Sequence, residues 1–154
     1  GFWLAKYAAR KGYHKPTGTI ALNYCNNLRI FRYAETLLAY AELVGVEGVA
    51  EQKGISAQQC LDMVRDRAFG DTNHRVAVNK QNIINENHYE FVGEGHRYYD
   101  VVRWGITEVL NVGNVPGINS ARTWKSHNKY VAIPQGDIDA TKGTEFELKQ
   151  NEGY

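Results

Sequence analysis

The sequence has the length and composition of one folded domain, so we expect residues 1–154 to form a single domain. It has 154 residues, 43% hydrophobic and 23% charged, and a chain of this length can bury a single core. Its 18 Lys and Arg against 17 Asp and Glu give a net charge of +1, which argues against a nucleic-acid partner. No apolar run approaches the roughly 20 residues that span a bilayer.

The first part of the chain divides into an irregular lead-in and a helix. Residues 1–27 lack sustained periodicity, apart from a possible short helix between Trp3 and Arg10. From Leu28 to Gly45 the apolar residues recur at helical spacing, with Ile30, Ala34, Leu37, Leu38 and Ala41 on one stripe. We expect this stripe to be buried.

A second helix follows and should pair with the first. Ser56 and Gln59 form a capping box, and Cys60, Leu61, Val64 and Ala68 continue at helical spacing until Gly70. Two such helices resemble one unit of a helical solenoid. Cys25 and Cys60, both in expected helices, match no zinc-ligand or C-x-x-C spacing and are either buried free thiols or a disulfide.

Two more helices and a loop-rich tail complete the prediction. Asn79 can cap a third helix that runs to Phe91, and a fourth should extend from about His96 to Leu110. Residues 111–129 are rich in Gly and small polar residues and predict a long loop. Residues 130–133 suggest a short strand or an extended piece that ends at Pro134, and the following "QGDIDATKG" suggests turns. The fold class is therefore mainly α, with a helical core over 28–110 and a loop-rich tail over 111–154.

The stretch "EFVGEGHRYYDVVRWG" (90–105) concentrates charge around two glycines. Glu86, Glu90 and Glu94 recur every four residues, and Arg97 and Arg103 follow closely enough to pair with them. Asp100 can pair with Arg103 along the fourth helix. We interpret the stretch as a structural ion-pair network at a helix corner.

An acid–base site is the alternative interpretation of these carboxylates. A glycoside hydrolase needs two carboxyl groups about 5 to 10 Å apart, one of them kept protonated, and Glu90 with Glu94 is the candidate pair. His88 and His96 lie nearby, but no metal-binding motif includes them. No nucleophile, phosphate-binding or dinucleotide motif is present, so we expect no catalytic residue, no metal and no cofactor.

Four segments, in order, resemble the C-terminal region of the SusD/RagB family of nutrient-binding outer-membrane lipoproteins. "LRIFRYAETLLAYAEL" (28–43) is similar to the family's R-Y-A-E helix, with Arg32 and Glu35 at its motif positions. The 90–105 stretch resembles E-F-x-G-E-G-x-R-x-x-D-x-x-R-W-G, which includes Gly95, Asp100 and Trp104. "YVAIPQGDID" and "LKQNEGY" resemble the family's I-P-Q segment and its Q-N-x-G-Y ending.

The resemblance implies a fold and a function. It implies tetratricopeptide-like helix pairs that carry loops, and a protein longer than this chain that begins with a lipidated cysteine. It implies a non-enzymatic cell-surface lipoprotein of the outer membrane, which captures glycans for a SusC-like TonB-dependent transporter. Peptide binding, as in some members, is the alternative ligand class, and a purely structural helical-repeat adaptor also remains open.

The candidate ligand residues come from the chemistry of sugars, because apolar sugar faces stack on aromatic rings and hydroxyls need polar neighbours. Trp124 lies in the long polar loop near Arg122 and Asn128, and is the best candidate platform. The alternative is that Trp124 packs the loop onto the helices. Trp3 is a weaker candidate, and Trp104 is expected in the core.

Overall fold

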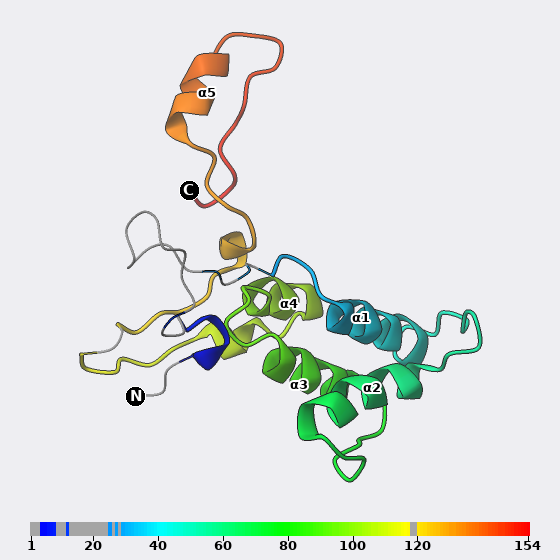
Figure 1. Ribbon diagram of the computed structural model, residues 1–154. Helices are drawn as coiled ribbons and strands as arrows, with labels where there is room; N and C mark the ends of the chain where they lie inside the picture. The colour runs from blue at the N-terminus through cyan, green and yellow to red at the C-terminus, as the bar shows by residue number, and fades with distance from the viewer. Residues whose placement is uncertain (1–3, 9–11, 13–24, 26, 28, 118–119) are drawn as a thin grey trace. The chain divides into compact units, whose positions relative to one another are not determined.

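The computed structural model describes residues 4–8, 12, 25, 27, 29–117 and 120–154. Within them it contains five α-helices, α1 to α5, short 3-10 helices and a single isolated β-bridge, which confirms the mainly helical fold class (Figure 1). The chain divides into two compact units, unit 1 (1–97) and unit 2 (98–154). The prediction of one domain stays a prediction.

The first long helix, α1 (Tyr33–Gly45), starts later than its sequence pattern indicates. Leu37, Leu38 and Ala41 are buried as expected, but Ile30 is 85% exposed and lies before the helix. The expectation for Ile30 was wrong because Arg32 has an extended backbone, which ends the helical register before it reaches residue 30. Only the lead-in 3-10 helix Ala5–Tyr7 is described between Trp3 and Arg10.

The second helix, α2 (Ala57–Phe69), follows its sequence signals closely. The Ser56 hydroxyl accepts the Gln59 backbone N–H at 3.1 Å, and the Gln59 side chain accepts the Ser56 N–H at 2.8 Å. Gly70 ends the helix with φ of 77°, a left-handed conformation that favours glycine. Both termini are thus fixed by local hydrogen bonding and confirm the predicted capping box.

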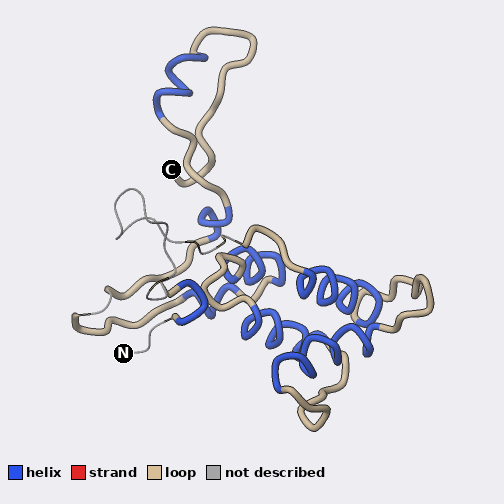
Figure 2. The backbone as a smooth tube through the Cα atoms, viewed as in Figure 1, coloured by secondary structure: helices blue, strands red, loops and turns tan. Residues whose placement is uncertain are grey.

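Unit 1 has its core where α1 packs against α2 and against α3 (Lys80–Glu90), and Figure 2 shows the course of the three helices. The Asn79 side chain caps α3 by accepting the Asn82 N–H at 2.9 Å. The fully buried side chains of this core include Leu38, Leu61, Val64 and Ile83. At Gly45 an added Cβ would lie 2.2 Å from Val78 Cγ1, so glycine allows this close approach.

Unit 2 begins inside α4 (Arg97–Trp104), whose first residue belongs to unit 1. The predicted fourth helix was too long, because after Gly105, with φ of 71°, the chain continues as the 3-10 helix Thr107–Leu110. The expected strand at residues 130–133 does not form. The segment predicted as turns is instead the helix α5 (Gln135–Thr141). Pro134 is its N-cap, and the Pro134 carbonyl accepts the backbone N–H groups of Asp137 and Ile138 at 3.0 and 3.3 Å, a helix start that the turn residues concealed.

Both cysteines are free thiols in the structure, and only one is buried. Cys60 belongs to the core of α2, where burial raises the pKa of its thiol. Cys25 is exposed and lies outside any helix, so the expectation of a buried helical Cys25 was wrong. Over the described ranges, no helix is long and apolar enough to cross a membrane, and no cluster of His, Cys, Asp and Glu could hold a metal ion.

The core of unit 1 can be tested by a pair of leucine substitutions. Leu61→Ala, at a position with no exposed surface, should lower the free energy of unfolding by about 2–5 kcal/mol because it leaves a cavity. Leu43→Ala, at a side chain 51% exposed on α1, should cost less than about 1 kcal/mol. Urea denaturation followed by circular dichroism measures both; equal losses would contradict the described core.

Candidate functional site

Three glutamates at the end of α3 form a buried carboxylate cluster, consisting of Glu86, Glu90 and Glu94. Glu86 and Glu90 are 4% and 9% exposed, and the Glu94 side chain is 1% exposed. A buried carboxylate is costly unless cations and hydrogen bonds compensate it. The partners of these three side chains therefore decide whether the cluster can do chemistry.

Arg32 is the central partner of the carboxylate cluster. Its Nη1 donates to Glu90 Oε1 at 2.7 Å, while Nε and Nη2 donate to the two oxygens of Glu94 at 2.8 and 2.9 Å. Nη2 also donates to the Glu90 backbone carbonyl at 3.2 Å. The pairing of Arg32 with Glu94 is bidentate, which is the strongest geometry of an arginine–carboxylate pair. Arg32 thereby joins the residue before α1 to the end of α3.

Further cations complete the cluster. Lys6 donates to Glu94 and, at 2.7 Å, to the Glu90 carbonyl. Arg67 donates to Glu90 Oε2 at 2.5 Å, and Arg65 pairs with Glu86. Each carboxylate thus has at least one cationic partner in unit 1.

The partners differ from those expected from the sequence. Among the described residues, Arg97 forms no ion pair with the three glutamates, and one buried Arg97 nitrogen has no hydrogen-bond partner. Arg103 pairs with Asp100 at 3.4 Å, as expected for a spacing of three on α4. The expectation for Arg97 was wrong because spacing along the chain favoured a near neighbour, whereas the structure uses arginines distant in sequence.

The pKa values show that Glu94 is held as a carboxylate. Burial by itself would raise the pKa of Glu94, but hydrogen bonds from Arg32 and Lys6 outweigh it, and the pKa lies below its usual value. Burial would likewise lower the pKa of Arg32, but its bonds to Glu94 and Glu90 raise it. A general acid needs a carboxyl with a raised pKa, and Glu94 has the opposite shift.

The Arg32 guanidinium packs over the Phe91 ring, and His96 in turn stacks on Phe91. The guanidinium carbon lies 5.0 Å from the Phe91 ring centroid, and Phe91 stacks on His96 with centroids 4.6 Å apart. His96 Nδ1 is 3.9 Å from Glu35 Oε1. The glycines between them permit the sharp turn, with φ of 77° at Gly93 and 84° at Gly95.

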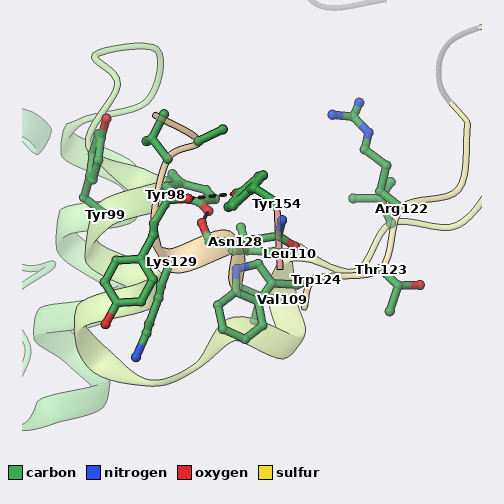
Figure 3. Close-up of a pocket in the computed structure, with 14 residues that line it drawn as sticks. Tyr98, Tyr99, Val109, Leu110, Arg122, Thr123, Trp124, Asn128, Lys129 and Tyr154 are labelled. Carbon is green, nitrogen blue, oxygen red and sulfur yellow. Dashed lines mark hydrogen bonds between the residues drawn. The ribbon is translucent and has the colours of Figure 1, made fainter. Parts of the chain in front are cut away.

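Unit 2 contains an aromatic cavity of about 910 Å³ (Figure 3). Aromatic side chains dominate its lining, and amide and cationic groups accompany them. The lining includes Tyr98, Tyr99, Trp124, Tyr130, Tyr154, Arg122, Asn128 and Lys129. In the view of Figure 3, Tyr99 and Arg122 lie on opposite sides of the cavity, with Trp124 between them.

Trp124 is positioned by the backbone of the long loop. Val112 and Arg122 exchange two backbone hydrogen bonds of 2.9 and 2.8 Å, which close the loop between them. The Asn111 side-chain oxygen accepts the backbone N–H of Trp124 at 2.8 Å. The Trp124 side chain is half-buried, and its indole nitrogen is buried with no acceptor among the described residues. The loop thus presents a fixed indole to the cavity.

The end of the chain builds another wall of the cavity. Gln150 exchanges two hydrogen bonds of 2.9 Å with the Ile133 backbone, and Asn151 donates to the Val131 carbonyl at 2.7 Å. The Tyr154 hydroxyl donates to the Tyr130 carbonyl at 2.8 Å. Gly153 has φ of 94°, and a Cβ there would lie 2.6 Å from the His127 ring. The "QNEGY" segment therefore fixes residues 130–133 in place of strand pairing.

The structure brings together three of the four expected ligand residues. Trp124, Arg122 and Asn128 all line the aromatic cavity, whereas Trp3 lies outside the described residues. Sequence reasoning missed Tyr98, Tyr99 and the C-terminal tyrosine. The high content of 10 tyrosines was the available signal, but it did not indicate which of them converge. Trp104 is partly buried on α4 and does not line the cavity.

Glu94 offers a test of the carboxylate cluster. Glu94→Gln should lower the free energy of unfolding at pH 7 by about 3 kcal/mol, because Arg32 and Lys6 lose a buried anionic partner. The folded-state pKa of Glu94 is lowered, so its contribution is present above the unfolded value of about 4.3 and is lost as the pH falls through the folded value.

Chemical denaturation at pH 7 and pH 3 measures this dependence. The difference between wild type and Glu94→Gln should shrink at pH 3, while Glu47→Gln, at an exposed glutamate, should change little at either pH. A destabilisation of Glu94→Gln that is unchanged at pH 3 would contradict an ion-pair origin.

The chain is similar in sequence and in structure to surface glycan-binding proteins. The chain is 54% identical to surface glycan-binding protein A from Bacteroides fluxus, with a TM-score of 0.82 over 96% of this chain and 31% of that one. It is 41% identical to the Bacteroides thetaiotaomicron protein of the same name in complex with laminarihexaose, with a TM-score of 0.71 over 88% of this chain and 27% of that one. These relatives are glycan-binding proteins.

A further relative is SusD-like protein P25 from Formosa agariphila, 33% identical over 91 residues, which are 54% of this chain and 16% of that protein. The chain spans less than a third of the length of these relatives. The model of the SusD family matches residues 1–154. The fold and the motifs of the sequence agree with that match, and the chain belongs to the SusD family.

Proposed function

We propose that this chain is part of a non-catalytic cell-surface protein that binds laminarin-type glucan oligosaccharides in the aromatic cavity of unit 2. The single observation that carries the proposal is the convergence of Trp124 and several tyrosines on one cavity with Asn128 and Arg122. Two similar structures support the ligand class, one bound to laminarihexaose and one described as a laminarin-binding SusD-like protein, 32% identical with a TM-score of 0.66.

The aromatic side chains suit the apolar faces of glucose rings. A pyranose ring presents C–H groups on each face, and an indole or phenol ring offers a flat apolar surface for them at small cost in side-chain entropy. Tyr99 is 72% exposed and Tyr130 is 51% exposed, so both rings are accessible to a ligand. The position of Trp124 between Tyr99 and Arg122 gives the cavity an extended footprint, suited to several linked sugars (Figure 3).

The polar groups of the cavity suit the sugar hydroxyls. Arg122 and Lys129 supply charged donors, and the Asn128 side chain already accepts the Lys125 N–H at 2.8 Å, which holds its amide in place. The Tyr98 hydroxyl is bound to the Asn128 carbonyl, so this phenol is oriented by the protein rather than by the ligand (Figure 3). Fixed polar groups reduce the entropy lost on binding.

The carboxylate cluster supports binding without catalysis. Both oxygens of Glu90 and both oxygens of Glu94 accept hydrogen bonds from arginine or lysine. A hydrolase of either stereochemistry needs one protonated carboxyl and one available carboxylate. Glu90 and Glu94 offer neither, so a role in architecture is the better account of them.

Family membership supports a cellular setting as part of the same proposal. We place the protein at the outer membrane as a lipid-anchored surface protein, with a SusC-like TonB-dependent transporter as its partner. Capture at the surface would then precede transport of the oligosaccharide.

The aromatic cavity is tested by titration of laminarihexaose in a calorimeter. Trp124→Ala and Tyr99→Ala should each weaken binding by about five- to tenfold, the equivalent of about 1–1.4 kcal/mol of stacking. Phe146→Ala is the matched control, because Phe146 is a 75% exposed aromatic of unit 2 that does not line the cavity.

Tyr99→Ala separates binding from folding, since the exposed ring should contribute little to stability. Unchanged affinity in both cavity variants would refute this site. Reducing ends released from laminarin by the wild-type chain would refute the non-catalytic role.

A further inference from the structure

A second, basic cavity lies in unit 1, beside the carboxylate cluster. Its volume is about 450 Å³, and polar surface dominates it. The lining consists of Ala5, Lys6, Arg29, Arg32, Arg67, Tyr89 and Glu90. Four cationic side chains thus face one cavity with a single lining carboxylate.

The charges of the basic cavity do not cancel. Lys6 and Arg32 are matched by Glu90 and Glu94, through the ion pairs described above. Arg67 adds a third cation, which shares Glu90 with Arg32. Arg29 adds a fourth, and it forms no ion pair with any described residue. The cavity therefore carries an excess of positive charge even with both glutamates ionised.

Glu90 does not offer a free anionic oxygen to the cavity. Its Oε1 accepts from Arg32 at 2.7 Å and its Oε2 from Arg67 at 2.5 Å. Its backbone carbonyl accepts from Lys6 at 2.7 Å and Arg32 at 3.2 Å. The Glu90 oxygen atoms thus already accept hydrogen bonds, whereas some guanidinium N–H groups that line the cavity have no acceptor among the described residues.

The remaining donors belong to Arg29 and Arg67. Arg67 uses Nη2 for Glu90, and among the described residues its other guanidinium nitrogens have no acceptor. Its side chain is 60% exposed, so those nitrogens are accessible. The Arg29 guanidinium lies over the Tyr7 ring, 6.0 Å from its centroid, which holds the side chain while leaving its N–H groups available.

We propose that the basic cavity binds an oxyanion, with Arg29 and Arg67 as its principal donors. A carboxylate or a sulfate offers oxygens spaced to accept paired guanidinium N–H groups. The volume exceeds that of a small inorganic ion, and the ring of Tyr89, 66% exposed, lines the same space. An acidic sugar, with the anion on the arginines and a ring face against Tyr89, uses all of these features.

This inference stands apart from glucan binding, because every lining residue belongs to unit 1 and laminarin-type glucans carry no charge. Two sources of the oxyanion can be separated by experiment. Sodium glucuronate and sodium sulfate serve as probes for a sugar-borne anion and a free anion, with glucose as the neutral probe.

The test is a titration of the full chain with the three probes, followed by heteronuclear NMR at low salt. Glucuronate should shift the amide resonances around Arg29 and Arg67 with saturable affinity, and added sodium chloride should weaken it. Arg29→Gln should reduce the affinity by about tenfold or more. It should alter stability little, because Arg29 forms no ion pair with a described residue and only its contact with the Tyr7 ring, at 6.0 Å, is lost. Lys80→Gln, which removes an exposed cation outside the cavity, should leave the affinity unchanged.

Each outcome supports or overturns the proposed oxyanion site. Tighter binding of glucuronate than of sulfate assigns the site to an acidic sugar, and equal binding assigns it to the oxyanion alone. No saturable shift with either anion, equal shifts with glucose, or undiminished affinity in Arg29→Gln overturns the inference. Laminarihexaose binding by Arg29→Gln, measured alongside, shows separately whether glucan binding holds.

Discussion

The pairing of Arg32 with Glu90 and Glu94 is the constraint on which unit 1 depends. Two carboxylates are buried at the end of α3, and a guanidinium from the segment before α1 holds both of them. Without that cation Glu94 would keep only Lys6, and Glu90 only Arg67, as a cationic partner. The pair therefore ties the first helix of the core to the last, and the glycines at 93 and 95 let the chain turn where it does.

The carboxylate cluster and the aromatic cavity differ in whether their polar groups already have partners within the protein. The carboxylate cluster resembles a catalytic constellation in sequence, yet the oxygens of Glu90 and Glu94 accept hydrogen bonds from arginine and lysine, and the pKa of Glu94 is lowered. The aromatic cavity has little sequence pattern, yet it gathers the exposed rings suited to a ligand. In this chain the densely charged segment thus has a structural role, whereas aromatic residues that are scattered in the sequence form the candidate binding surface.

Local signals were readable from the sequence, and distant contacts were not. The capping box of α2 and the Asn79 cap of α3 depend on residues three apart, so their prediction was confirmed. The late start of α1 and the helix at Gln135–Thr141 were missed, because extended Arg32 and Pro134 decide them against the local pattern. Arg32 and Lys6 reach Glu94 across 62 and 88 residues, a distance that spacing rules do not address.

Gln150, Asn151 and Tyr154 form hydrogen bonds to residues 130–133. During synthesis this part of the aromatic cavity can therefore form only after the helices of unit 1. During synthesis, the side that Tyr130 and Tyr154 give to the cavity stays unformed while those last residues remain in the ribosome's exit tunnel. The helices of unit 1 have no such dependence and can condense earlier. A nascent chain arrested shortly before residue 150 would thus have the helices of unit 1 in place while the cavity side formed by Tyr130 and Tyr154 is still missing.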